Sequence, residues 1–159
     1  MTVRPVGVGD AEGFVRAYEE SWDAALAALA GRSLKELSPY EERIEAFRKT
    51  FGGELPAGAG AWVAEADGAI VGVAVRVGPE LRSLYVVPKA WGTGAAHALI
   101  ETAVAAIRAD GHPEAMLWVV EENPRARRFY EREGWESTGE TRASELGPSE
   151  LQYRRQLSP

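Results

Sequence analysis

The sequence predicts a mixed α/β fold, in which one central sheet of about seven strands is flanked by helices on both faces. Short β-type segments in the middle of the chain follow one another through tight turns, which indicates antiparallel strands. A helix after Gly94 then leads to a buried-type strand at residues 115–120, which indicates a crossover to a parallel neighbour. The chain has 159 residues and shows neither a linker nor a repeat, so we expect a single domain over residues 1–159.

The first third of the chain predicts a short strand and two helices. The strand is expected at residues 2–6, and Asp10 is the expected N-cap of a helix that continues through an Ala-rich run to Ala30. The segment Ser38-Pro39-Tyr40-Glu41 resembles a capping box with Pro at the first helical position. It predicts a second helix that extends to about Phe51.

The remaining two thirds alternate between strands and helices. Strands are expected at residues 61–66, 69–77, 80–87, 115–120, 135–141 and 151–157, with turns at Gly and Pro between them. Helices are expected from Gly94 to about Asp110 and from Asn123 to about Glu133.

Composition excludes several classes of function. The chain has no Cys, which rules out disulfides, thiolate metal sites and cysteine nucleophiles. Its net charge of −6 is unlike that of a nucleic-acid-binding protein and would attract cationic substrates such as amines. The N-terminus has no signal-like apolar run, and no stretch approaches the length of a membrane span, so we expect a cytoplasmic protein without a membrane partner.

The loop at Gly92–His97 carries the clearest chemical signal. A strand ends before it and an amphipathic helix begins within it, so free N–H groups and the helix dipole favour an anion such as a phosphate. The dinucleotide-binding fingerprint needs Gly or Ala where His97 stands, and a P-loop at residues 134–139 fails because Glu140 stands where Lys is needed. An ordinary glycine turn remains the alternative.

Two blocks of sequence resemble the GNAT superfamily of acyl-CoA-dependent N-acetyltransferases. Trp91-Gly92-Thr93-Gly94-Ala95-Ala96 matches the acyl-CoA loop of that family at Gly94 and Ala96, although Trp91 replaces the family's Arg or Gln. The second block, residues 117–135, resembles the family's signature of Asn, Ala, Tyr, Gly and an aromatic residue, with Asn123 and Tyr130 in the matching places. The resemblance extends from about Val63 to Glu136.

The resemblance implies roles for individual residues. It implies acetyl-CoA as the acyl donor and the loop as its pyrophosphate site, formed by Gly92, Thr93, Gly94, Ala95, Ala96 and His97. It implies that the backbones of Leu84, Tyr85 and Val86 bind the pantetheine amides and that Asn123 helps to hold the cofactor. Tyr130 is the implied general acid, because a phenol stays protonated at neutral pH; core packing is its structural alternative.

The base that deprotonates the amine is less well defined. Glu80 opens the strand that leads to Tyr85, where part of the family carries such a carboxylate; the alternative is an exposed strand-end carboxylate. Other relatives carry their Glu at the position of Trp118 and this chain cannot use that route. The only histidines, His97 and His112, make a poor metal site, so no metal is expected.

The sequence therefore predicts transfer of an acetyl group from acetyl-CoA to a primary amine of a small molecule or peptide. A different acyl donor and a catalytically silent acyl-CoA-binding or regulatory module are the alternatives, and a homodimer is left open. In this fold the acceptor is expected between residues 18–40 and the loop Ser144–Ser149. Candidate residues there are Glu19, Glu20, Trp22, Asp23 and Tyr40, for which core packing or solvated charge is the competing interpretation.

Overall fold

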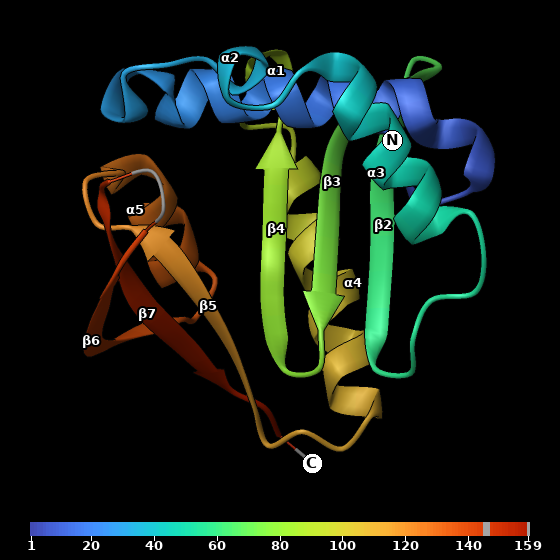
Figure 1. Ribbon diagram of the computed structural model, residues 1–159. Helices are drawn as coiled ribbons and strands as arrows, with labels where there is room; N and C mark the ends of the chain where they lie inside the picture. Colours follow the sequence, from blue (N-terminus) through green and yellow to red (C-terminus); the bar gives the residue numbers. More distant parts are fainter. Residues whose placement is uncertain (145–146, 159) are drawn as a thin grey trace.

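The computed structural model describes residues 1–144 and 147–158 and contains a seven-stranded mixed sheet, ordered β1-β2-β3-β4-β5-β7-β6 (Figure 1). The strands are β1 Thr2–Pro5, β2 Ala59–Ala66, β3 Ala69–Val77, β4 Glu80–Val86, β5 Glu114–Val120, β6 Glu136–Ala143 and β7 Ser149–Gln156. The helices are α1 Ala11–Ala30, α2 Leu34–Leu37, α3 Tyr40–Phe51, α4 Ala95–Ala109 and α5 Pro124–Arg132, with short 3₁₀ turns at Val8–Asp10 and Pro88–Ala90. The predicted fold class is confirmed.

The two halves of the sheet separate between β4 and β5. These two strands run parallel, and Glu80 and Met116 are their only paired residues. Next to this pair, the Met116 N–H donates a hydrogen bond to the Pro79 carbonyl at 3.0 Å. Arg82 is an extra residue in β4, because Leu81 and Ser83 face consecutive residues of β3. The strands therefore diverge toward their carboxyl ends, as Figure 1 shows.

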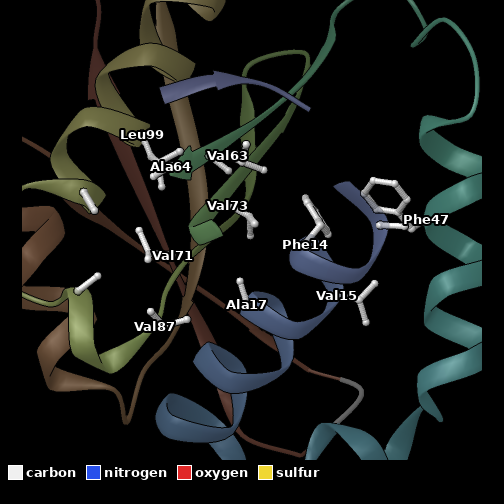
Figure 2. Packing of buried hydrophobic residues seen from close by; sticks show 14 of the residues in the cluster. Phe14, Val15, Ala17, Phe47, Val63, Ala64, Val71, Val73, Val87 and Leu99 are labelled. Atoms are coloured by element: carbon white, nitrogen blue, oxygen red, sulfur yellow. The ribbon is translucent and has the colours of Figure 1, made fainter. Parts of the chain in front are cut away.

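Each half of the sheet has its own hydrophobic core. In the first core, Phe14 of α1 packs on Phe47 of α3 with ring centroids 5.2 Å apart, above buried Val63 and Val73 (Figure 2). The second core lies among β5, β7 and α5 and includes the fully buried Leu117 and Tyr153. Helix α4 contributes Leu99 to the first core and the next residue, Ile100, to the second. This helix therefore holds the two halves together behind the split.

The helices predicted after Asp10 and Ser38 form, but without side-chain caps. Asp10 is the N-cap residue of α1, as predicted, but its side chain makes no capping hydrogen bond to that helix; its carboxylate accepts the Gly7 N–H at 2.7 Å and binds the Arg4 guanidinium at 2.8 Å. The capping box at Ser38 does not form either, because Ser38 ends the unpredicted helix α2 and α3 begins at Tyr40 without a side-chain cap. Local polar spacing therefore located the helix starts but misassigned the side chains.

Over the described ranges 1–144 and 147–158, no helix combines the length and the hydropathy that crossing a membrane requires.

Candidate active site

A cavity of about 410 Å³ lies where β4 and β5 diverge. Its walls come from α1, β4, the loop after β4, the first turn of α4, β5, α5 and the start of β7. Every residue predicted as catalytic or cofactor-binding lines it except Glu80 and Thr93. The split thus brings together segments from both sequence blocks, which are separate in the chain.

The first turn of α4 faces this cavity. Gly92 and Gly94 have φ angles of 76° and 89°, and Gly94 is the N-cap. This left-handed conformation favours glycine because an L side chain would be strained there. The N–H groups of Ala95, Ala96 and His97 have no acceptor within the helix, and they begin a 15-residue helix whose dipole favours an anion at this end.

Thr93 holds the shape of the loop. Its hydroxyl donates to the Ala90 carbonyl at 2.5 Å, and its backbone N–H donates to the same oxygen at 3.3 Å. Because these contacts point into the preceding 3₁₀ turn, the Thr93 side chain fixes the loop rather than lining the cavity. The side chain of Thr93 thus supports the loop, and the place of Thr93 in a phosphate-binding loop stays a prediction.

The backbone of β4 offers polar groups to the split. The Val87 N–H donates to the carbonyl of Val71, which lies opposite it on β3, at 2.9 Å. Hydrogen bonding alternates along an antiparallel pair, so Tyr85 directs its backbone toward β3, whereas Leu84 and Val86 direct theirs toward β5. The divergence of β4 and β5 leaves these groups without a strand partner. The expectation that the Tyr85 backbone binds pantetheine is corrected, because this backbone pairs with β3. The side chain of Tyr85 lines the cavity instead.

Tyr130 lies in the cavity wall on α5. Its ring is 9% exposed and meets Phe129 edge-on, with centroids 5.4 Å apart. Burial raises the pKa of Tyr130 above the ordinary value for a phenol. The side chain therefore combines the packing role and the access to the cavity that the sequence analysis treated as alternatives.

Asn123 caps the helix that carries Tyr130. Its side-chain oxygen accepts the Ala126 N–H at 3.3 Å, with Pro124 at the first helical position, so the predicted N-cap is confirmed. Asn123 also lines the cavity. Its cap fixes the start of α5 and, through that helix, the position of Tyr130.

Glu80 lies outside the cavity. It begins β4 at the end where that strand still pairs with β5, and its carboxylate accepts the Arg82 guanidinium at 3.0 Å. Glu150, at the start of β7, does line the cavity, on the side away from the first turn of α4. Its carboxylate accepts a hydrogen bond from the Arg142 guanidinium at 2.8 Å. The sequence analysis missed Glu150 because only the pairing of β7 with β5 brings it opposite Val120.

Buried phenols gather next to Glu150. The rings of Tyr18 and Tyr85 lie 4.6 Å apart between centroids. Burial, together with Tyr18, Tyr130 and Glu150 as neighbours, raises the pKa of Tyr85 well above its ordinary value. Tyr85 and Tyr130 thus place two phenol groups in the cavity wall together with Glu150.

The predicted acceptor residues on α1 are largely occupied elsewhere. Trp22 is 4% exposed and belongs to the core, while Glu19 pairs with Arg43 and Asp23 accepts the Leu34 N–H at 2.7 Å. Glu20 and Tyr40 line a separate hollow on the outer side of α1. The residues of α1 that do line the cavity are Ser21, Ala25 and Leu26. Residues 145–146 of the predicted acceptor loop lie outside the described residues.

The side chain of His97 lies at the rim of the cavity. Its Nδ1 atom is 2.8 Å from a carboxylate oxygen of Glu133, and the carboxylate of Glu101 is near enough to complete a possible cation-binding group. Glu101, however, already accepts the Arg155 guanidinium at 2.6 Å. Glu101 is therefore paired with Arg155, and the hydrogen bond between His97 and Glu133 ties α4 to the end of α5.

The arginines of α5 differ in what they contact. Arg127 donates to the Tyr153 hydroxyl at 3.1 Å and to the Glu121 carbonyl at 3.2 Å. Arg125 lines the cavity instead, with its guanidinium carbon 3.2 Å from the centroid of the Trp91 ring. The departure from the family pattern at Trp91 was the signal that could have identified Arg125.

Known proteins resemble the chain in sequence and in fold. A sequence profile described as the Acetyltransferase (GNAT) family matches residues 14–135. An uncharacterized N-acetyltransferase of Mycobacterium bovis is 40% identical over 86 residues, which cover 51% of this chain and 54% of the relative. The chain thus spans about half the length of the curated relatives that it matches.

Solved structures share nearly the whole fold. The PaiA N-acetyltransferase of Thermoplasma acidophilum, solved in complex with coenzyme A, has a TM-score of 0.75 at 18% identity and covers 98% of both chains. A phosphinothricin acetyltransferase of Sinorhizobium meliloti, solved with acetyl-CoA, has a TM-score of 0.74 at 20% identity and covers 99% of this chain and 88% of its own. The suggested resemblance is confirmed, and the chain belongs to the acetyltransferase (GNAT) family of acyltransferases.

Proposed function

We propose that the chain transfers the acetyl group of acetyl-CoA to a primary amine of a small molecule or peptide. The observation that carries this proposal is the single cavity that joins the N-terminus of α4 to the hydroxyl-bearing ring of Tyr130. The first feature suits a pyrophosphate and the second suits a leaving thiolate. Acetyl-CoA is the donor that this combination favours, because that molecule has phosphates toward one end and its thioester sulfur at the other.

The backbone of β4 would hold the donor between these ends. Leu84 and Val86 direct N–H and C=O groups toward the split, where β5 offers no pairing partner. The Val86 carbonyl accepts the Trp91 indole N–H at 2.9 Å, so the groups left for the pantetheine amides and for the oxyanion are the N–H groups and the Leu84 carbonyl. A fixed N–H donor at a developing oxyanion is a strong catalytic contribution.

Tyr130 would supply the proton for the departing thiolate. In direct attack, the amine nitrogen bonds to the thioester carbon, the carbon–sulfur bond then breaks, and the sulfur takes the phenolic proton. The raised pKa of Tyr130 keeps this proton in place at neutral pH until the thiolate forms.

We assign deprotonation of the amine to Glu150 rather than to Glu80. Glu150 lines the cavity, whereas Glu80 does not line it and its carboxylate binds Arg82. The cavity wall at Trp118 has no acid, so the alternative position used by some relatives is closed. A carboxylate at the cavity wall attracts an ammonium group and can accept its proton directly or through water.

Glu150→Gln should slow turnover most at low pH. There the amine is mostly charged and depends on a base, so we expect a loss of about 10²-fold, which shrinks as rising pH supplies neutral amine. The measurement is a pH–rate profile under saturating acetyl-CoA. Glu80→Gln is the matched control, because it makes the same change on a carboxylate outside the cavity, and its profile should follow that of the unchanged protein. The reverse pattern would return the role to Glu80.

The proposed function is tested by acetyl-CoA consumption against a panel of primary amines. Calorimetry on the same protein measures CoA binding separately. Turnover of at least one amine with release of free CoA is the expected result. Tight CoA binding without turnover of any amine, and equally without turnover of other acyl-CoA donors, would favour the silent acyl-CoA-binding module.

A further inference from the structure

We propose that Arg125, held over the Trp91 ring, provides the cationic contact to the pyrophosphate of the acyl donor. This inference rests on the proposed function, and it concerns how this particular chain completes its phosphate site. The family pattern has Arg or Gln where this chain has Trp91, so the loop itself lacks a polar side chain at that position. The cavity obtains its cation from another element, at the start of α5.

The stacking geometry fixes the guanidinium. Its central carbon lies 3.2 Å from the centroid of the Trp91 ring, which is the arrangement of a cation–π contact. The ring is itself anchored, because its indole N–H donates to the Val86 carbonyl at 2.9 Å. A contact made through the central carbon leaves the N–H groups of the guanidinium available as donors to phosphate oxygens.

Trp91 and Arg125 lie at the end of the split where β4 and β5 have diverged. Trp91 follows β4 and Arg125 follows β5, and both line the cavity together with Gly92 and Gly94. The strands are held together at their other end by the pairing of Glu80 with Met116. The stacked pair therefore bridges the two halves of the sheet beside the first turn of α4.

Charge also distinguishes Arg125 from Arg82 and Arg127. Within the described residues no carboxylate lies within salt-bridge distance of its guanidinium, whereas Arg82 pairs with Glu80. Arg127, two residues further on, is occupied by Tyr153. A guanidinium placed on a ring, without an acidic partner, is suited to an anion that comes with the ligand.

Arg125→Ala should weaken CoA binding about 10–100-fold, since a hydrogen bond to a charged group is lost. Calorimetry with CoA, dephospho-CoA and pantetheine separates the contacts. The loss should be equal for CoA and dephospho-CoA and absent for pantetheine, which has no phosphate. Arg128→Ala removes the same charge from an exposed position on the same helix outside the cavity and should leave all three affinities unchanged.

Trp91 is a positioning residue in this proposal. Trp91→Leu should weaken CoA binding in the unchanged protein and have little further effect in Arg125→Ala, because the ring acts through the guanidinium. Arg125→Lys should recover part of the affinity, since it keeps the charge without the planar stack. Additive losses from the two substitutions would show that Trp91 acts independently of Arg125.

Several results would overturn the inference without touching the proposed function. Unchanged CoA affinity in Arg125→Ala is one, and a loss confined to CoA but absent for dephospho-CoA is another, because it would move the contact to the 3′-phosphate. A loss that extends to pantetheine would indicate a distorted cavity. Failure of the unchanged protein to bind CoA at all would instead refute the proposed function.

Discussion

Tyr130→Phe should reduce the rate of the chemical step about 10²–10⁴-fold, the usual contribution of a general acid. The substitution keeps the ring, which is 9% exposed and packs against Phe129 and Trp135, and removes only the hydroxyl. The melting temperature and the affinity for CoA should therefore stay the same. The rate must be measured in single turnover or with a poor acceptor, since slow product release would otherwise conceal the effect.

Tyr153→Phe provides the matched control for Tyr130. Tyr153 is a fully buried phenol in the same core, with its ring centroid 6.4 Å from that of Tyr130, but it does not line the cavity. Its hydroxyl donates to Glu131 and accepts from Arg127, each at 3.1 Å. Its removal should cost about 0.5–1.5 kcal/mol of stability per hydrogen bond and leave the chemical step unchanged. Equal rates in Tyr130→Phe and the unchanged protein would make Tyr130 a packing residue, with the thiolate protonated by water.

The sheet and the phosphate loop could be predicted because their signals are local. Gly92 and Gly94 stand at φ angles that favour glycine, and a strand and an amphipathic helix flank them directly. The spacing from Asn123 to Tyr130 corresponds to two turns of one short helix. The position of the Tyr130 ring relative to the N-cap Asn123 therefore depends only on residues that are close in sequence. Such features need no knowledge of how distant strands pair.

The side chains that the sequence analysis misplaced depend on long-range pairing. Glu150 reaches the cavity because β7 inserts between β5 and β6, an order that the sequence of turns does not specify. Arg125 and Trp91 meet because β4 and β5 diverge and carry their following loops to the same opening. Glu80 is a candidate base from its place at the start of a strand, with an exposed strand-end carboxylate as its alternative; in the structure it does not line the cavity, and its carboxylate binds Arg82.

The same reasoning explains the acceptor side. Trp22 and Asp23 carry aromatic and acidic character in the sequence, yet Trp22 is in the core and Asp23 binds the start of α2. Their apolar or charged nature is visible in the sequence, whereas the rotation of α1 about its axis is set by packing on β3 and β4. The small residues Ser21 and Ala25 of α1 consequently face the cavity and leave room in it.

Gly94→Val should abolish measurable binding of CoA. A side chain at this N-cap would stand among the N–H groups of the first turn of α4, where the pyrophosphate is expected, and the φ angle of 89° adds backbone strain. That strain alone costs of order 1–3 kcal/mol in stability, so loss of binding must be separated from loss of folding.

Gly111→Val makes that separation. Gly111 follows the other end of α4 and has a φ angle of 86°. At both Gly111 and Gly94, an added Cβ would have no neighbouring atom within 4 Å. The two positions differ in that Gly94 lines the cavity and Gly111 does not. Both variants should lose similar melting temperature, whereas only Gly94→Val should lose CoA binding in calorimetry. If Gly94→Val binds CoA as tightly as Gly111→Val, the first turn of α4 does not hold the pyrophosphate. The anion would then have to be bound by side chains at the rim, because a backbone site cannot tolerate a branched residue at its centre.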